Sequence, residues 1–200
     1  IAPIDEAAAA LYYDLPAFDA RLFFLPNDFI QIHAGINRAM VNAALEALNV
    51  TAGDTVLELF SGLGNFSVPL ARQAAHVVTV EGEAGLVERA RVNAGANGVD
   101  NIEAHVANLF EPEASPSWAQ PPIDKVLIDP PRSGAAEVLP QVAASEAKRI
   151  VYCSCHPATL ARDAGELVHR YGYRLTHAGV MDMFPHTAHI ESMAVFERNG

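Results

Sequence analysis

Short apolar runs alternate with helical periodicity along most of the chain, and this alternation is the first indication of its fold. Runs containing Val, Ile and Leu predict buried strands over residues 55–60, 76–80, 102–106, 125–129 and 149–154. Apolar positions at helical spacing predict helices over residues 37–48 and 83–96, and two more that begin near Asn65 and Pro157. Two further strand-like runs follow, over residues 173–181 and 192–196.

Strands that alternate with helices in this way form a doubly wound, mostly parallel sheet with helices on both faces. The last two strands have no predicted helix between them, so one of them is expected to run antiparallel to its neighbour. The pattern therefore predicts an α/β, Rossmann-like domain whose seven-stranded sheet contains an antiparallel strand near the C-terminus.

Residues 1–30 do not follow this alternation. Two apolar stretches, 11–15 and 21–25, lie on either side of Pro16 and Asp19 and predict a β-hairpin. We interpret residues 1–30 as the remnant of an upstream domain and residues 31–200 as the main domain. The sequence begins at Ile1 and not at Met, from which we expect a fragment or a processed product.

Composition narrows the class of protein. Half of the 200 residues are hydrophobic and 18% are charged, as in a globular protein and unlike a disordered one. No apolar run reaches the roughly 20 residues of a membrane-spanning helix. The net charge of −11 argues against a domain that holds nucleic acid by charge alone. Only two cysteines are present, which favours free thiols in a reducing, cytoplasmic compartment.

Two features at the carboxyl ends of the first strands, where open parallel sheets bind ligands, indicate an adenosine-containing ligand. Gly62 and Gly64 in the turn after residue 60 would let the backbone approach a ligand closely. Glu81 ends the second strand, where a carboxylate can bind both hydroxyls of a ribose. The third glycine of the pyrophosphate fingerprint is missing, so the pattern favours S-adenosylmethionine over NAD. A tight turn and a solvated carboxylate are the alternative interpretations.

The sequence Asp129-Pro130-Pro131-Arg132 follows the fourth strand. Its prolines donate no backbone hydrogen bond and stiffen the exit of the chain beside the ligand edge. Similar turns occur in enzymes that methylate amino groups, so this motif indicates methyl transfer without identifying the acceptor. Taken alone, it could also be a rigid surface turn.

Cys155 distinguishes between acceptors. It ends a strand and precedes His156-Pro157, a predicted helix start whose dipole would lower the pKa of the thiol. Methyl transfer to an amine needs no thiolate, whereas C5 of a pyrimidine becomes nucleophilic only after a thiolate adds at C6. Cys153 lies inside the apolar run and is interpreted as a core residue.

Five segments together resemble the catalytic domain of the RNA uracil-C5 methyltransferases, and most of all its bacterial members that modify 23S ribosomal RNA. The segments are Phe24–Gln31, Leu59–Phe66, Asp129–Arg132, Tyr152–Asp163 and Met183–Met193, in the order of the family. The resemblance implies the class I S-adenosylmethionine-dependent methyltransferase fold, with residues 31–200 as the catalytic domain.

The resemblance also implies roles for individual residues. Cys155 would be the nucleophile that adds to uracil C6, and Glu191 the general base that removes the C5 proton. The residues implied to hold S-adenosylmethionine are Gln31, Phe60, Asn65, Glu81, Asn108 and Asp129, to which the glycine turn adds Gly62. Without the resemblance, Glu191 reads as a surface carboxylate. Its neighbours His186 and His189 have poor spacing for zinc, so no metal is predicted.

Some features depart from the family. His33 and His156 occupy positions where asparagine is common, and Ser61 one where cysteine is frequent. Ribosomal members carry an upstream RNA-binding barrel and a cysteine-ligated iron–sulfur cluster, which two cysteines cannot ligate here. We therefore expect residues 1–30 to adjoin an RNA-binding domain, and ribosomal RNA to be bound mainly through upstream parts.

The sequence thus predicts methylation of C5 of a uridine in ribosomal RNA, through a covalent bond between Cys155 and the base. Three alternatives stay open. The first is the same reaction on a tRNA uridine, and the second is an amino-group methyltransferase that uses Asp129–Arg132. The third is a non-catalytic domain that only binds the cofactor.

Overall fold

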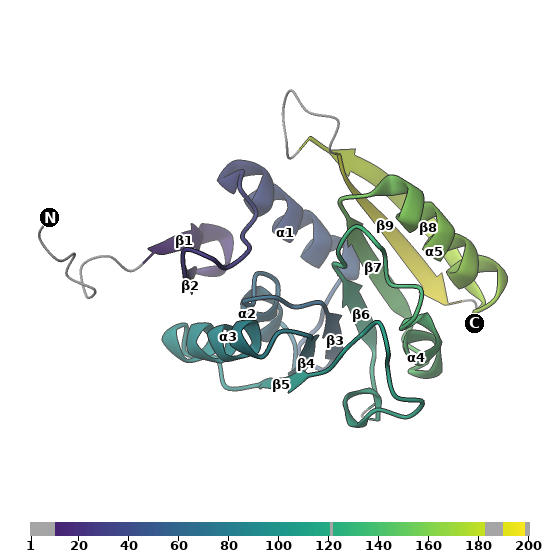
Figure 1. Cartoon of the computed structure of the whole chain (residues 1–200), viewed down its shortest axis with the longest axis horizontal. Helices are drawn as coiled ribbons and strands as arrows, with labels where there is room; N and C mark the ends of the chain where they lie inside the picture. The colour runs from purple at the N-terminus through teal and green to yellow at the C-terminus, as the bar shows by residue number, and fades with distance from the viewer. Residues whose placement is uncertain (1–10, 121, 183–189, 199–200) are drawn as a thin grey trace, which may run out of the picture.

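A computed structural model describes residues 11–120, 122–182 and 190–198, and its centre is a seven-stranded sheet (Figure 1). In chain order the strands are β3 (Thr55–Leu59), β4 (His76–Glu81), β5 (Ile102–Val106), β6 (Lys125–Ile128), β7 (Arg149–Ser154), β8 (Tyr173–Met181) and β9 (Glu191–Arg198). Their order in space is β5-β4-β3-β6-β7-β9-β8. β9 is antiparallel to β7 and to β8, and the other pairings in this sheet are parallel. The predicted antiparallel strand is therefore confirmed as β9.

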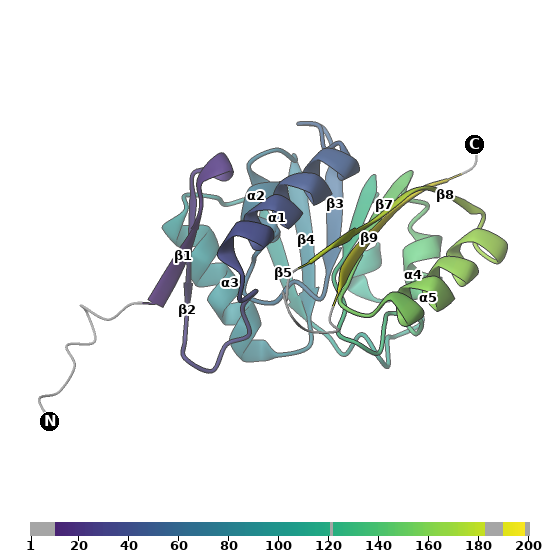
Figure 2. The same cartoon turned by 90° about the horizontal axis from the view of Figure 1, so that it is seen from above.

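Both faces of the sheet are buried, because apolar residues alternate between two cores. Val56 and Leu127 belong to a core shared with α1 (Ala34–Leu48) and α2 (Ser67–Ala71), beside which α3 (Ala84–Ala96) packs. Their neighbours Leu57 and Val126 face the core formed with α4 (Leu139–Ala144) and α5 (Pro157–His169). Figure 2 shows the sheet between these two groups of helices. No helix in the described part of the chain has the length and hydropathy that a membrane span requires.

Three helices differ from the sequence prediction. α1 begins earlier than residue 37, because Nδ1 of His33 accepts a hydrogen bond from the Ile36 N–H at 3.2 Å and caps the helix. α2 begins at Ser67 and not near Asn65, because the positive φ angle of Gly64, 100°, interrupts the chain before it. α4 was not predicted, because its six residues are too few to show a period.

The predicted hairpin is present as β1 (Leu11–Leu15) and β2 (Ala20–Phe24), with Leu15 and Leu22 buried in the core beside α1. Asn93 of α3 and Asn97, which follows the end of this helix, pair with the outer edge of β2. Asn93 exchanges hydrogen bonds with the Phe23 N–H and C=O at 2.8 and 3.1 Å. The side chain of Asn97 likewise accepts from the Arg21 N–H and donates to the Arg21 C=O. The hairpin is thereby attached to the main domain; its assignment to an upstream domain stays a prediction.

We expect Asn93→Ala to destabilise the fold more than Asn97→Ala. Asn93 is fully buried and also donates to the Leu63 carbonyl at 2.9 Å, so its loss leaves buried backbone groups unpaired. The cost is about 2–4 kcal/mol for Asn93 and about 1 kcal/mol for the half-buried Asn97. Urea unfolding followed by circular dichroism measures both. Equal losses of unfolding free energy in the two variants would contradict the prediction that burial makes the loss of Asn93 more costly.

Candidate active site

One cavity of about 610 Å³ brings together all nine residues that the sequence singled out. They are Gln31, Phe60, Gly62, Asn65, Glu81, Asn108, Asp129, Cys155 and Glu191. The cavity lies at the carboxyl ends of β3 to β7. After β5, at one edge of the sheet, the chain crosses to β6, which lies on the other side of β3, and the cavity is beside this change of direction. Open α/β sheets bind ligands at such a switch point, so the fold itself places a binding site here.

The turn after β3 forms one wall of the cavity. Phe60 has a φ angle of 62°, which is rare for a residue with a side chain, and its N–H donates to the Val80 carbonyl at 2.9 Å. Its ring packs against Phe110 with centroids 5.7 Å apart. The sequence analysis missed Phe110, although it follows Asn108 by two residues at the exit of β5. The two rings give this wall an apolar surface suited to a planar base.

Glu81 is held in a fixed orientation at the end of β4. One of its carboxylate oxygens accepts the Gly62 N–H and the other accepts the Glu83 N–H, each at 3.0 Å. Each oxygen keeps a free lone pair, because a carboxylate accepts about four hydrogen bonds. The carboxylate is therefore positioned to receive hydroxyl donors, as ribose recognition requires.

Two amide side chains complete the wall nearest the hairpin. Oδ1 of Asn65 accepts from the Tyr13 hydroxyl at 2.9 Å and from Nδ2 of Asn37 at 3.0 Å, and Nδ2 of Asn65 donates back to Asn37. Oε1 of Gln31 is buried and has no hydrogen-bond partner among the described residues. Buried acceptors are nearly always paired, so Gln31 marks a place where a bound ligand could supply a donor.

Strand pairing brings Cys155 and Glu191 together. The antiparallel pairing of β7 and β9 ends at Ser154 and Ser192, so Cys155, which directly follows β7, lies near Glu191, the first residue of β9. The Ser192 hydroxyl donates to the Ser154 carbonyl at 2.9 Å and fixes this register at its end. A nucleophile and a carboxylate from distant parts of the sequence thus face one cavity. His186 and His189 lie outside the described residues.

Burial raises the pKa values of two carboxyl groups in the cavity, those of Asp129 and Glu191. Burial raises the pKa of Glu191, of which 3% is exposed. Burial, together with the charge of Glu191, raises the pKa of Asp129 to about 7. At neutral pH the two groups therefore hold protons more readily than ordinary carboxyls do.

The expected low pKa of Cys155 is wrong. Burial, followed by the charges of Glu191 and Asp129, raises the pKa of its thiol, and the backbone hydrogen bond and Arg132 only partly oppose this. The helix start that motivated the prediction is present at Pro157. Burial and the charges of the two carboxyl groups outweigh it, and neither is visible in the local sequence.

Glu58 is a buried acid of β3 for which no role was predicted from the sequence. One of its oxygens accepts from the Ser67 hydroxyl at 2.6 Å, and the other has no partner in the described part of the chain. Burial, then the charges of Asp129 and Glu81, raises its pKa to about 8 despite the Ser67 hydrogen bond. Through Ser67, Glu58 ties β3 to the start of α2 beneath the cavity turn.

We expect Glu58→Gln to stabilise the protein increasingly as the pH rises from 5 to 8. The pKa of Glu58 is higher in the folded state than in the unfolded state, so its contribution is present below about 4.5 and is lost as pH rises to about 8. The loss is at most about 5 kcal/mol at 1.36 kcal/mol per pKa unit. Urea unfolding at several pH values measures the difference, with the exposed Glu88→Gln as a control for charge removal. If the difference in unfolding free energy between Glu58→Gln and the wild type stays constant with pH, Glu58 does not have a raised pKa in the folded protein.

Comparison with known families agrees with this arrangement. The model of the tRNA (Uracil-5-)-methyltransferase family matches residues 15–114 and 118–199. A protein of Alkalilimnicola ehrlichii named 23S rRNA (uracil(1939)-C(5))-methyltransferase RlmD is 62% identical over 194 residues, which cover 97% of this chain and 44% of that protein. The protein of the same name from Methylococcus capsulatus is 56% identical over 99% of this chain and 45% of its own length. The chain therefore spans less than half the length of these relatives.

Solved structures give the same fold. The Pyrococcus abyssi tRNA (uracil-54, C5)-methyltransferase in complex with S-adenosyl-L-homocysteine superimposes with a TM-score of 0.76 and 29% identity, over 94% of this chain and 44% of that one. The predicted class I methyltransferase fold is thus confirmed. Since the family model extends over nearly the whole sequence and the fold agrees with that of a solved member, the chain belongs to the tRNA (uracil-5-)-methyltransferase family.

Proposed function

We propose that this chain is the catalytic part of an enzyme that transfers a methyl group from S-adenosylmethionine to C5 of a uridine in 23S ribosomal RNA. The observation that carries the proposal is the placement of Cys155, directly after β7, and Glu191, the first residue of the paired strand β9, in the wall of one cavity. Relatives named for 23S ribosomal RNA are 62% and 56% identical, whereas the tRNA-modifying structure is 29% identical. The 23S substrate is therefore favoured over the tRNA alternative.

The cavity suits S-adenosylmethionine in shape and in charge. Glu81 would bind the ribose hydroxyls, while Phe60 and Phe110 would enclose the adenine between apolar surfaces. At the polar end of the ligand, the unpaired oxygen of Gln31 would accept a hydrogen bond, and the remaining N–H of Asn65 would donate one. When bound, this cofactor supplies an electrophilic methyl group on a positively charged sulfonium, which the carboxyl group of Asp129 would favour.

Asn108 and Gly62 complete the proposed cofactor site. The Asn108 side-chain oxygen accepts the Phe110 N–H at 3.0 Å, which leaves its amide nitrogen as a donor at the exit of β5. Gly62 has a φ angle of 55°, a conformation that favours glycine, and its N–H orients Glu81. Both residues thus fix the backbone that a nucleoside would contact.

Cys155 would begin the reaction. Its sulfur adds to C6 of the uracil, and the ring becomes an enolate that is nucleophilic at C5 and accepts the methyl group there. The thiol must lose its proton first, and its raised pKa makes this costly in the empty cavity. A cation bound in the same cavity would lower that pKa, because opposite charge favours the thiolate.

Glu191 would complete the reaction. Once C5 carries the methyl group, Glu191 takes the remaining C5 proton and Cys155 leaves C6, which restores the aromatic ring and the free enzyme. The raised pKa of Glu191 makes it a stronger base than an ordinary glutamate. Base and nucleophile must reach opposite ends of one C5–C6 bond, so the uridine has to be flipped out of its stack.

The charge of −11 implies that most of the RNA affinity lies outside this acidic catalytic part. Phosphate contacts supply much of the affinity of RNA-binding proteins, and an acidic catalytic domain supplies few of them. We expect residues 1–200 alone to bind ribosomal RNA weakly, with most of the affinity and any iron–sulfur cluster in other parts of a longer protein. The enzyme would work in the cytoplasm, a reducing compartment in which its two cysteines would stay as free thiols.

The direct test is transfer of a labelled methyl group to 23S ribosomal RNA that lacks the modification. The complete gene product should label one uridine, which nuclease digestion and mass spectrometry identify as 5-methyluridine. Labelling of tRNA instead would favour the first alternative, and a methylated amino group would favour an enzyme that uses Asp129–Arg132. Binding of S-adenosylmethionine without turnover on any RNA would favour a non-catalytic domain.

A further inference from the structure

We propose that Thr159, Arg162 and Asp163 on one face of α5 are positioning residues that set the distance between Cys155 and the segment Arg132–Ala135. This inference rests on the proposed function, because it concerns where the uracil would be held during attack by Cys155. None of the three residues lines the cavity, so their effect would be exerted through the segment that they hold.

Three successive contacts join this face of α5 to the segment. The Thr159 hydroxyl donates to the Arg132 carbonyl at 3.1 Å, and Nη2 of Arg162 donates to the Ser133 carbonyl at 2.8 Å. The Ala135 N–H donates to Oδ2 of Asp163 at 2.8 Å. Residues three and four apart lie on the same side of a helix, so these side chains meet the segment as one row.

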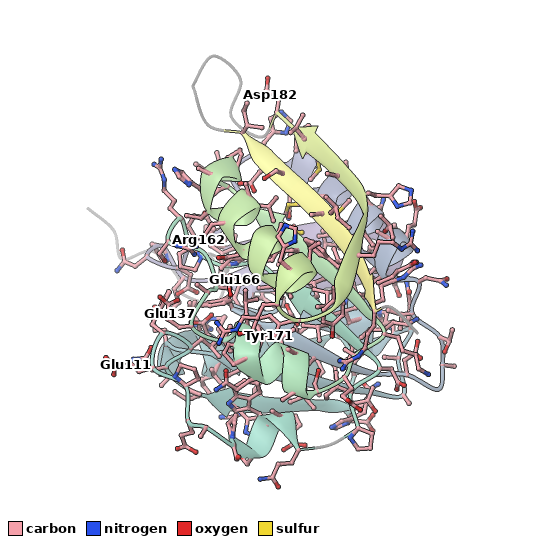
Figure 3. The ribbon with its side chains drawn as sticks, turned by 90° about the vertical axis from the view of Figure 1, so that its right-hand side faces the viewer. Glu111, Glu137, Arg162, Glu166, Tyr171 and Asp182 are labelled. Carbon is pink, nitrogen blue, oxygen red and sulfur yellow. The ribbon has the colours of Figure 1, made fainter. Side chains whose placement is uncertain are left out.

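Asp163 is the centre of this row. Its exposed fraction is 0%, yet both carboxylate oxygens are paired: Oδ2 also accepts from the Tyr152 hydroxyl at 2.6 Å, and Oδ1 accepts from Nε of Arg162 at 2.8 Å. All of its partners are donors. A carboxylate that only accepts therefore satisfies the site, whereas an amide would not. Figure 3 shows Arg162 at the side of α5, where half of its side chain is exposed.

Gly134 provides independent evidence that the segment is fitted to Asp163. Its φ angle is 84°, and a Cβ atom there would lie 2.5 Å from Nη2 of Arg162 and 2.6 Å from Oδ2 of Asp163. Real Cβ atoms do not approach other atoms so closely. The segment can therefore lie against α5 only with glycine at this position.

Thr159 connects this row with the nucleophile. The same hydroxyl that contacts the Arg132 carbonyl also lies 3.0 Å from the carbonyl of His156, the residue after Cys155. One side chain thus links the exit of β7, which carries Cys155, to the exit of β6, which carries Arg132. Both Cys155 and Arg132 line the cavity, so a uracil bound between them would be placed by this link.

The test uses Asp163→Asn in the complete gene product, with RNA that carries 5-fluorouridine at the target position. This RNA traps the covalent complex, because fluorine cannot leave C5 as a proton does. The amide would place donors against the donors of Ala135 and Arg162, so we expect the segment to shift. At saturating RNA and cofactor, the rate constant of adduct formation should fall about 10- to 100-fold, since a misplacement of about 1 Å costs that much.

The amplitude of adduct formation separates positioning from stability. It counts correctly folded sites and should stay near one per enzyme, and the affinity for S-adenosylmethionine should change little. The matched control is Tyr173→Phe, which removes a buried hydrogen bond to the Ala147 carbonyl from the start of β8, at the amino end of β7 and so at the far end of the strands from the cavity. This control should leave the rate constant unchanged at a similar loss of melting temperature.

A second pair of variants covers the case in which Asp163→Asn does not fold. Thr159→Val removes the hydroxyl and keeps the shape, and it should slow adduct formation, whereas Thr159→Ser should restore it. A lower amplitude with an unchanged rate constant, or equal rates for Thr159→Val and Thr159→Ser, would overturn the inference. Absence of any adduct with the wild-type protein would instead contradict the proposed function.

Discussion

Replacing Cys155 by alanine should lower methyl transfer to RNA by about 10⁴-fold or more and leave the binding of S-adenosylmethionine intact. Loss of a covalent nucleophile has effects of this order or greater in other enzymes, because no remaining group can replace it. The cavity keeps its other walls, so cofactor affinity, measured by calorimetry, should change little. The variant should also form no covalent complex with RNA that carries 5-fluorouridine, as judged by denaturing gel electrophoresis.

Cys153→Ala is the matched control for this experiment. Cys153 lies on β7, two positions before Cys155, but its side chain is fully buried in the core and outside the cavity. Its replacement should lower the melting temperature and leave the reaction rate per folded molecule unchanged. Retention of activity by Cys155→Ala would favour an amino-group methyltransferase and would contradict the covalent mechanism.

Glu191→Gln should stop the reaction at a different point. The amide cannot take the C5 proton, but Cys155 can still add to the base, and C5 can still accept the methyl group. A methylated covalent complex should therefore accumulate with ordinary uridine, while turnover falls about 10²- to 10⁴-fold, as expected for loss of a general base. Mass spectrometry of the trapped complex should find one methyl group per bound RNA.

Glu197→Gln provides the control for charge and strand position. Glu197 lies on β9 as Glu191 does, but it pairs with Arg149 and Arg174 at the other end of the strand. The control should turn over normally and accumulate no complex. Normal turnover by Glu191→Gln would assign the proton transfer to another group, of which Asp129 is the nearest candidate because its charge is coupled to that of Glu191.

The positions of the strands along the chain, and the ends of some of them, could be predicted because strand-like apolar runs have a local signature in the sequence. The predicted strand 149–154 coincides with β7, and 173–181 coincides with β8. The carboxyl end of each strand then locates its polar residues at one edge of the sheet. This is why Glu81 and Cys155, which are far apart in the sequence, could both be placed at the site beforehand.

Features that depend on register and tertiary packing could not be predicted. The raised pKa of Cys155 comes from burial and then from the charges of Glu191 on the antiparallel β9 and of Asp129 directly after β6, and nothing near Cys155 in the sequence indicates these neighbours. Tyr13 reaches the site because the hairpin packs beside α1. Its hydroxyl then donates to Asn65, which lies 52 positions later in the sequence. Asp163 would look like an ordinary helical surface residue without the segment that covers it.

The protonated thiol of Cys155 has a consequence for the lifetime of the enzyme. Peroxides and alkylating agents react with thiolates far faster than with thiols, and overoxidised cysteine cannot be repaired in most proteins. An active-site cysteine with a permanently low pKa would be consumed while the enzyme waits for its substrate. Burial, together with the charges of Glu191 and Asp129, raises the pKa of Cys155, so in the proposed mechanism the empty cavity would also protect the nucleophile from chemical damage until a positively charged cofactor enters.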